Sequence, residues 1–242
     1  SESNPMKDAF SIYATYLSDL YERRERIVRA SRDLTMNSKK AIFQVHRIDK
    51  HNKQNVLEKA HSDLATVADQ HLSRLAKELQ GSDIWKLRRA YSPGVQEYVE
   101  ASTFYNFCIN GSLLTLDEMN SMLRPPSIDP SVEPFQINLL DYLLGVADMT
   151  GELMRLAIGR ISDGEFEFAQ EIHRFAHEIY RQFILVAPKM MDDMKTKMDT
   201  MLQSVTKIQY ACYRVHLRKL EYTRFTGSED SSFPLFGTGD VE

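Results

Sequence analysis

Apolar residues recur along this chain at intervals of three and four, the spacing of one face of an α-helix. The first fifty residues also repeat apolar or aromatic side chains every seven positions, which predicts one long helix over residues 5–48. At about 1.5 Å per residue, such a helix spans about 60 Å, longer than a compact globule needs. We therefore expect an elongated subunit. The repeat consists of Tyr13, Leu20, Ile27, Leu34, Ala41 and Ile48.

Polar breaks divide the rest of the chain into further predicted helices. A second helix follows the break at residues 50–54 and ends near Leu79, and a short one follows Asp83. Ser92-Pro93 pairs an N-cap residue with the residue favoured at the first helical position, so a new helix is expected from there to Asn110. Later helices are predicted over 113–123, from Leu139 onward, from a capping box at Ser162–Glu165 to Val186, and from Pro188 to Tyr222.

No segment alternates with period two, so the pattern predicts an all-α fold, an elongated bundle of about six or seven helices. With 242 residues and 43% hydrophobic content, the chain can bury one large core. We expect a single domain over residues 1–225. Four prolines between Arg124 and Pro134 predict a loop over 124–135, and residues 226–242 are expected to form a flexible tail.

Composition limits the classes of function. A net charge of −4 argues against a uniformly basic nucleic-acid binder, but residues 21–50 hold nine Lys/Arg and four Asp/Glu, whereas residues 111–171 hold three and eleven. One region suits a polyanion and the other a cation. Cys108 and Cys212 are two distant residues in helical pattern, which favours reduced thiols and an intracellular protein. No apolar run has membrane-span length, and no signal-peptide pattern opens the chain.

Two predicted helices carry carboxylates on faces that are otherwise apolar or small. Glu97 and Glu100 share a face with aromatic and small residues, and no further charge follows until Asp117. Asp148 and Glu152 lie four apart on the helix that starts near Leu139. Burying a carboxylate is costly unless it is paired, protonated or bound to a cation. If the two helices adjoin, these four acids can converge on one point.

An all-oxygen cluster of this kind suits a hard divalent ion such as Mg²⁺, with Mn²⁺ as the alternative. A simpler interpretation stands beside it, because a polar stripe on an amphipathic helix usually faces water. That alternative applies more to Asp148 and Glu152 than to Glu97 and Glu100. Gly145 and Gly151 weaken the same helix, which predicts that a neighbour approaches it closely.

Basic residues precede the first carboxylate pair. Lys86, Arg88 and Arg89 stand beside Trp85 and Tyr91, so phosphate contacts and base stacking are expected near the acids. Ordinary surface charge and a buried Trp explain the same pattern, and both interpretations stay open. No Gly-rich phosphate loop, nucleophile elbow or paired Cys motif occurs.

The two carboxylate motifs, residues 96–101 and 141–155, closely resemble those of the translin family, in particular its catalytic subunit. Supporting matches are Ser31–Thr35 in the first helix, Lys77–Leu79 with Gly81, and Ala211–Tyr213 in the last helix. The resemblance covers most of residues 8–222. It implies an all-helical translin fold that joins translin subunits in a hetero-oligomeric barrel, located in the cytoplasm and the nucleus.

The resemblance also implies an activity. Such a barrel is an RNA-cleaving complex that degrades the nicked passenger strand in small-RNA silencing and trims precursor tRNA fragments. Glu97, Glu100 and Asp148 match the family's catalytic acids by motif position, and Glu152 matches its fourth metal ligand. Translin itself has apolar residues at the first three positions, so the resemblance favours the active subunit. Lys86, Arg88 and Arg89 become RNA-binding candidates by the same analogy.

Three functions follow as hypotheses. The first is a Mg²⁺-dependent endoribonuclease that acts on single-stranded RNA. The second is a non-catalytic helical adaptor whose first and last helices hold partner subunits, and the third is an RNA-binding module without cleavage. Dependence on a divalent ion separates the first from the other two.

Overall fold

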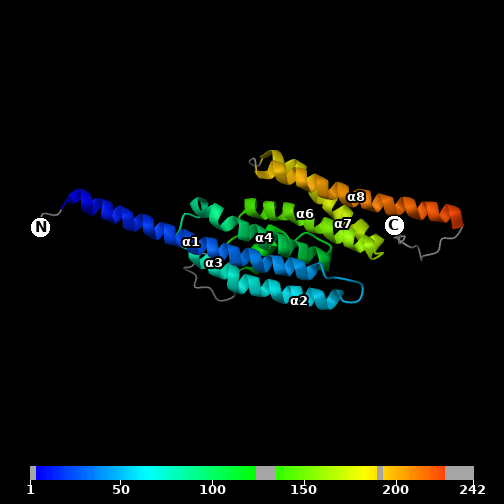
Figure 1. Ribbon diagram of the computed structural model, residues 1–242, viewed down its shortest axis with the longest axis horizontal. Coiled ribbons are helices and arrows are strands. Elements are labelled where there is room, and N and C mark those ends of the chain that lie inside the picture. Colours follow the sequence, from blue (N-terminus) through cyan, green and yellow to red (C-terminus); the bar gives the residue numbers. More distant parts are fainter. Residues whose placement is uncertain (1–3, 124–134, 190–192, 227–242) are drawn as a thin grey trace, which may run out of the picture.

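The computed structural model describes residues 4–123, 135–189 and 193–226, and each regular element in these ranges is a helix (Figure 1). The all-α prediction is confirmed. None of the described helices is long and apolar enough to cross a membrane. Most of the predicted loop at 124–135 and of the tail at 226–242 lies outside the described residues, so the domain limits stay a prediction.

The described elements follow one another along the chain as ten helical segments. They are α1 (Pro5–Val45), α2 (Lys53–Thr66), a π-helical segment (Val67–Leu72), α3 (Ser73–Leu79), α4 (Ile84–Asn110), α5 (Leu116–Met122), α6 (Leu139–Ser162), α7 (Phe166–Val186), a 3₁₀ turn (Ala187–Lys189) and α8 (Asp193–Thr226).

The α4–α6 pair forms the centre of an elongated bundle. On one side α1 packs along α4 and α2, and on the other α7 and α8 pack on α6 (Figure 1). The core between these helices contains Val99 and Phe104 of α4 and Met149 and Leu153 of α6, none of them exposed. This arrangement places the predicted carboxylate helices side by side.

The α1 helix is longer than the body that it packs on. Its first buried residue is Ile27, and Arg23 and Arg26 still contact Gln80 and Glu78 at the end of α3. The part of α1 before Arg23 extends away from the other helices (Figure 1). The heptad positions Ile27, Leu34 and Ala41 are buried as the repeat predicts, whereas Tyr13 and Leu20 are exposed. The projecting part of α1 therefore presents an apolar face with no cover among the described residues: Met6, Phe10, Ile12, Tyr13, Tyr16, Leu17, Leu20 and Tyr21 are all exposed.

Two predicted helix boundaries are wrong. The helix predicted to restart at Ser92-Pro93 is instead part of α4, which starts after the Asp83 cap and runs through Pro93. Pro93 lacks a backbone donor, but the Ser31 hydroxyl stabilises this turn from α1. It donates to the Tyr91 carbonyl at 3.1 Å and accepts from the Gly94 N–H at 3.1 Å. Ser92 does not cap the helix, since its hydroxyl donates to Asp141 of α6.

The second wrong boundary is the capping box predicted at Ser162–Glu165. Ser162 is still part of α6, and its hydroxyl donates back to the Ile158 carbonyl at 3.1 Å. Glu165 precedes α7 and makes no side-chain cap. A capping box does form at Thr115 and Glu118, where it starts the short helix α5.

Two glycines allow the central helices to approach each other. A Cβ on Gly145 would lie 2.6 Å from the Val99 Cβ and 2.7 Å from the Gln96 carbonyl, so α6 contacts the α4 backbone there. A Cβ on Gly94 would lie 2.6 Å from the Ser31 carbonyl of α1. The close approach predicted from glycine is therefore confirmed at Gly145. It is wrong at Gly151, where a Cβ would meet nothing within 4 Å.

This difference gives a matched pair of variants on one helix. We expect Gly145→Ala to lower the free energy of unfolding by about 1–3 kcal/mol, because the new methyl group must push α4 away. Gly151→Ala is expected to raise it by up to about 1 kcal/mol, because alanine favours the helix and the site is open. Urea denaturation checks both, and equal effects of the two variants would contradict a tight α4–α6 contact.

Candidate functional site

The four predicted carboxylates come together between α4 and α6. Glu97 and Glu100 of α4 face Asp148 and Glu152 of α6. Burial is the main cause that raises the pKa of Glu100, and the negative charges of the other three acids raise it further. Glu100 is 8% exposed and Glu152 is 7% exposed, so the stripe on α6 does not simply face water. We call these four residues the acid cluster.

Three of the acids have cationic or histidine partners, which come from α1, α6 and α8. Lys39 of α1 lies 3.3 Å from the Glu97 carboxylate, and Lys197 of α8 donates to both oxygens of Asp148. The Arg155 Nε donates to Glu152 at 2.9 Å. His46, at the end of α1, places its Nε2 2.6 Å from the same carboxylate. The Lys39, His46 and Lys197 contacts join residues far apart in sequence, so local spacing gave no signal for them.

The four acids do not share one electrostatic state. Burial raises the pKa of Glu152, but the hydrogen bonds from His46 and Arg155 outweigh it and lower that pKa to about 2. Burial raises the pKa of Glu97, against the attraction of Lys39. For Glu100, burial and the three neighbouring acids raise the pKa to about 9. Glu152 is therefore ionised at neutral pH, and Glu100 holds a proton.

Glu100 is the acid without a partner. Among the described residues its carboxyl group forms no hydrogen bond and no ion pair. A buried carboxyl beside three others, with no donor directed at it, has the surroundings that a bound cation would satisfy. As the side chains stand, residues 4–123, 135–189 and 193–226 contain no group of three His, Cys, Asp or Glu donors close enough to hold a metal ion. Lysine contacts on Glu97 and Asp148 occupy two of the carboxylates instead.

A second buried polar network lies at the start of α6. Asp141 is completely buried and accepts hydrogen bonds from Arg88 at 2.9 Å, from Asn138 at 2.6 Å and from Gln96 at 3.1 Å. The network joins α4 to α6 next to the acid cluster. Its partners satisfy the Asp141 carboxylate within the protein, so this network holds the two helices in register.

The three predicted RNA contacts differ in their surroundings. Lys86 is exposed and lies 3.4 Å from Asp83, and Arg89 is also exposed. Arg88 is mostly covered, and its guanidinium donates to Asp141. Trp85 is 68% exposed, so it is available for stacking. The RNA-binding role of all three stays a prediction.

Known proteins resemble this chain in sequence and in fold. A family model described as the translin family matches residues 22–219. The chain belongs to the translin family. It is 33% identical over 238 residues to the translin-associated protein X of Pongo abelii, a match that covers 91% of this chain and 82% of that protein. The Schizosaccharomyces pombe homolog is 27% identical over 245 residues, with 95% and 96% covered.

More distant translin-family members match as well. Human translin is 24% identical over 161 residues, which cover 66% of this chain and 68% of that protein. Among solved structures, the AfC3PO–duplex RNA complex superposes with a TM-score of 0.64 and 19% identity, covering 88% of this chain and 98% of the other. The apo-NeC3PO crystal structure gives 0.62 over the same shares. At this identity, these structures show that the fold is shared.

The raised pKa of Glu100 gives the unfolding free energy a defined pH dependence. The ordinary value of 4.5 rises to about 9 on folding, so between these pH values the native state binds more protons than the unfolded state. Stability from this group is complete below pH 4.5 and is lost as pH rises toward 9, by at most about 1.4 kcal/mol per pH unit. In metal-free buffer we expect wild type to lose stability over this range relative to Glu100→Gln.

Urea denaturation at several pH values between 5 and 9 in EDTA measures this difference. The matched control is Glu171→Gln, which changes an exposed acid of α7 with no ion pair among the described residues. A constant difference between wild type and Glu100→Gln across this range would show that Glu100 titrates normally.

Proposed function

We propose that this chain is the catalytic subunit of a translin-type complex, a metal-dependent endoribonuclease that acts on single-stranded RNA. The observation that supports it most is Glu100, a buried acid with no partner among the described residues, near enough to three further carboxylates for each of them to raise its pKa. The motif resemblance supports the same residues in catalysis, and it extends the proposal to passenger-strand fragments and precursor tRNA fragments as substrates.

The acid cluster fits a hard divalent cation. Glu97, Glu100, Asp148 and Glu152 offer only oxygen donors, which Mg²⁺ and Mn²⁺ prefer. A bound Mg²⁺ would supply a Lewis acid for the scissile phosphate and a water of lowered pKa. Positive charge there would also allow the RNA backbone to approach an otherwise repulsive group of acids.

The surrounding side chains have roles that need no further group. His46 and Arg155 both contact the Glu152 carboxylate, which keeps it ionised and fixes its orientation. Phe104, 4.9 Å from the His46 ring, fixes that ring in turn. Lys39 and Lys197 lie at the edge of the acid cluster, where each can shift from its carboxylate to an RNA phosphate.

A second role accompanies the first. The exposed apolar face on the projecting part of α1 is larger than scattered surface residues explain, and such a face marks a protein interface. Relatives of this chain are named for their association with translin, and the AfC3PO structure contains duplex RNA. We infer that this chain also holds translin subunits in a hetero-oligomer. In the alternative function, the chain is a non-catalytic adaptor that holds translin subunits and does not cleave RNA.

Cleavage of a labelled single-stranded RNA by the chain co-purified with translin tests the proposal. In Mg²⁺ we expect Glu100→Gln and Asp148→Asn to slow cleavage by at least about a hundredfold, because each removes a charge from the cation site. EDTA should abolish wild-type cleavage. Size-exclusion chromatography must show unchanged assembly for both variants, and Glu171→Gln serves as the exposed-acid control.

Two results would contradict the nuclease function. Cleavage by Glu100→Gln and Asp148→Asn at the wild-type rate would make the acid cluster structural. Absence of cleavage by the assembled wild type in Mg²⁺ would favour the adaptor.

A further inference from the structure

A groove between α6 and α8 starts where the acid cluster ends. Two adjoining hollows, of about 680 Å³ and about 300 Å³, share Ile158, Ala211 and Arg214 in their walls. Asp148 contacts Lys197 at one end of this helix pair, and Ser162 lines a hollow with Arg218 at the other. The two helices therefore run parallel, and the 14 residues from Asp148 to Ser162 span about 21 Å.

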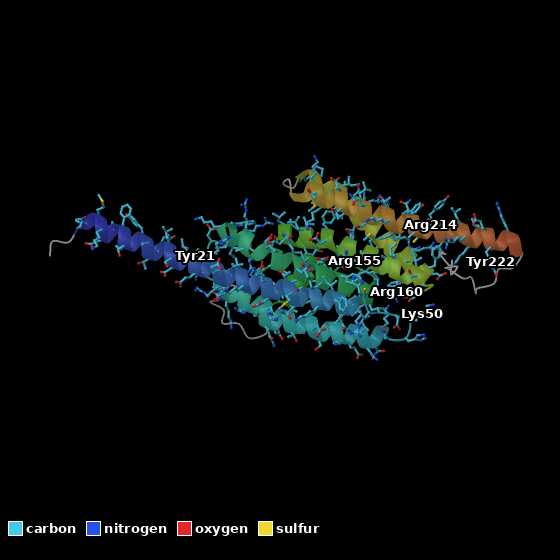
Figure 2. The ribbon with its side chains drawn as sticks, viewed as in Figure 1. Tyr21, Lys50, Arg155, Arg160, Arg214 and Tyr222 are labelled. Atoms are coloured by element: carbon cyan, nitrogen blue, oxygen red, sulfur yellow. The ribbon has the colours of Figure 1, made fainter. Side chains whose placement is uncertain are left out.

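All the charged side chains that line the groove are positive. Arg155, Lys207, Arg214 and Arg218 surround it, and neither hollow is lined by Asp or Glu. Lys207 and Arg214 are exposed and form no ion pair among the described residues. Figure 2 shows Arg155 on α6 and Arg214 on α8, the two helices that form the walls. The groove thus has one sign of charge beside a site of the opposite sign.

The floor of the groove is apolar and carries one exposed aromatic ring. Met154, Ile158 and Ala211 form the floor. Tyr210 is 61% exposed, and the Arg214 guanidinium lies 5.8 Å from the centre of its ring. Sites for single-stranded nucleic acid combine these elements, because cations contact the backbone and aromatic rings stack on the bases.

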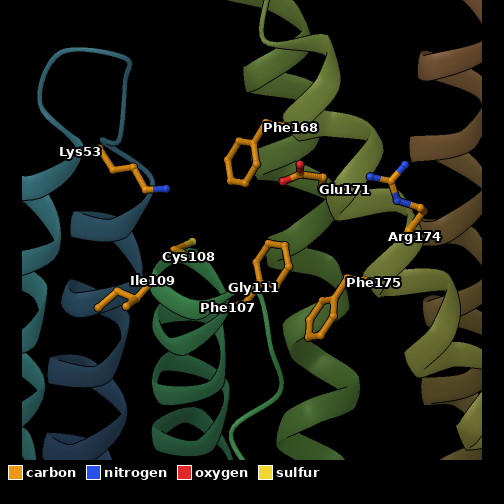
Figure 3. A pocket seen from close by; sticks show the side chains of 9 residues that line it. All are labelled: Lys53, Phe107, Cys108, Ile109, Gly111, Phe168, Glu171, Arg174 and Phe175. Carbon is orange, nitrogen blue, oxygen red and sulfur yellow. The ribbon is translucent and has the colours of Figure 1, made fainter.

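A cavity elsewhere in the described residues lacks this combination. It lies between the end of α4 and α7, measures about 510 Å³, and is lined by a Phe107–Phe175 stack with Lys53, Arg174 and Glu171 at its edge (Figure 3). Its charges have both signs. It therefore offers no continuous positive surface to a polyanion, and it does not adjoin the acid cluster.

We propose that the α6–α8 groove binds the single-stranded RNA on one side of the scissile phosphate. Arg155 connects the groove to the acid cluster, since it lines the first hollow and donates to Glu152. The backbone follows Lys207 and Arg214, and a base stacks on Tyr210. These residues position the substrate and take no part in bond cleavage. The inference rests on the proposed function for its substrate class.

RNA binding in EDTA tests the groove without cleavage. Fluorescence anisotropy measures the affinity of a labelled single-stranded RNA for the chain co-purified with translin, at several salt concentrations. The Lys207→Ala/Arg214→Ala double variant should bind about tenfold more weakly at low salt. Its slope of log affinity against log salt should be smaller by about 1.4, because each phosphate contact to a single strand contributes about 0.7. Lys59→Ala, an exposed lysine on α2, is the control and should change neither.

Each result decides between specific alternatives. Unchanged affinity and slope in the double variant would overturn the proposal. Loss of translin from the purified complex would overturn it too, since the groove would then be a subunit interface. Cleavage in Mg²⁺ tests the proposed function separately. If the double variant changes the salt slope but the wild type does not cleave RNA, the groove proposal stands and the nuclease proposal is rejected. If the wild type cleaves RNA but the double variant leaves the slope unchanged, the nuclease proposal stands and the groove proposal is rejected.

Discussion

Four carboxylates lie close together between two helices, where little water reaches them. Their mutual repulsion and their burial are the main electrostatic cost in this protein. Like charges at this distance repel strongly when water is scarce. Side chains from three helices compensate these charges: Lys39 and His46 at α1, Arg155 on α6 itself and Lys197 on α8. Glu100 stays without a partner in the described residues, and burial and its acidic neighbours raise its pKa to about 9. The packing of α1 and α8 around the central pair thus serves the site as well as the core.

Much of the fold follows from local pattern. The long first helix, the glycine contact at Gly145 and the all-α class are visible in the sequence because each depends on spacing within one segment. The wrong boundaries at Ser92 and Ser162 have one cause. Each serine has good capping chemistry, but a hydrogen bond elsewhere uses its hydroxyl: to Asp141 across the helix pair, and to the carbonyl of Ile158 in its own helix.

The site also contains residues that local sequence patterns identify and residues that only the folded structure brings together. The acids occur in two short motifs, so their spacing and the family resemblance are enough to identify them in the sequence. Their cationic partners could not be found this way, because Lys39 and Lys197 lie 58 and 49 residues from the acids that they contact. The basic groove was missed for the same reason, since Arg155 and Lys207 meet only when α8 packs on α6. The sequence likewise gave no signal that the Arg88 guanidinium donates to the buried Asp141, and its RNA-binding role stays a prediction.

The central claim is that the acid cluster exists to hold a cation, and thermal unfolding of the translin complex with and without Mg²⁺ tests it most directly. In EDTA, Glu100→Gln should unfold at the wild-type temperature or above it, because glutamine is neutral without taking up the proton that the buried Glu100 needs. Mg²⁺ should raise the midpoint of wild type, since an ion that binds only the native state stabilises it, and should raise that of Glu100→Gln much less. An equal rise in both, or a wild type that ignores Mg²⁺ while Glu100→Gln unfolds earlier in EDTA, would contradict the account.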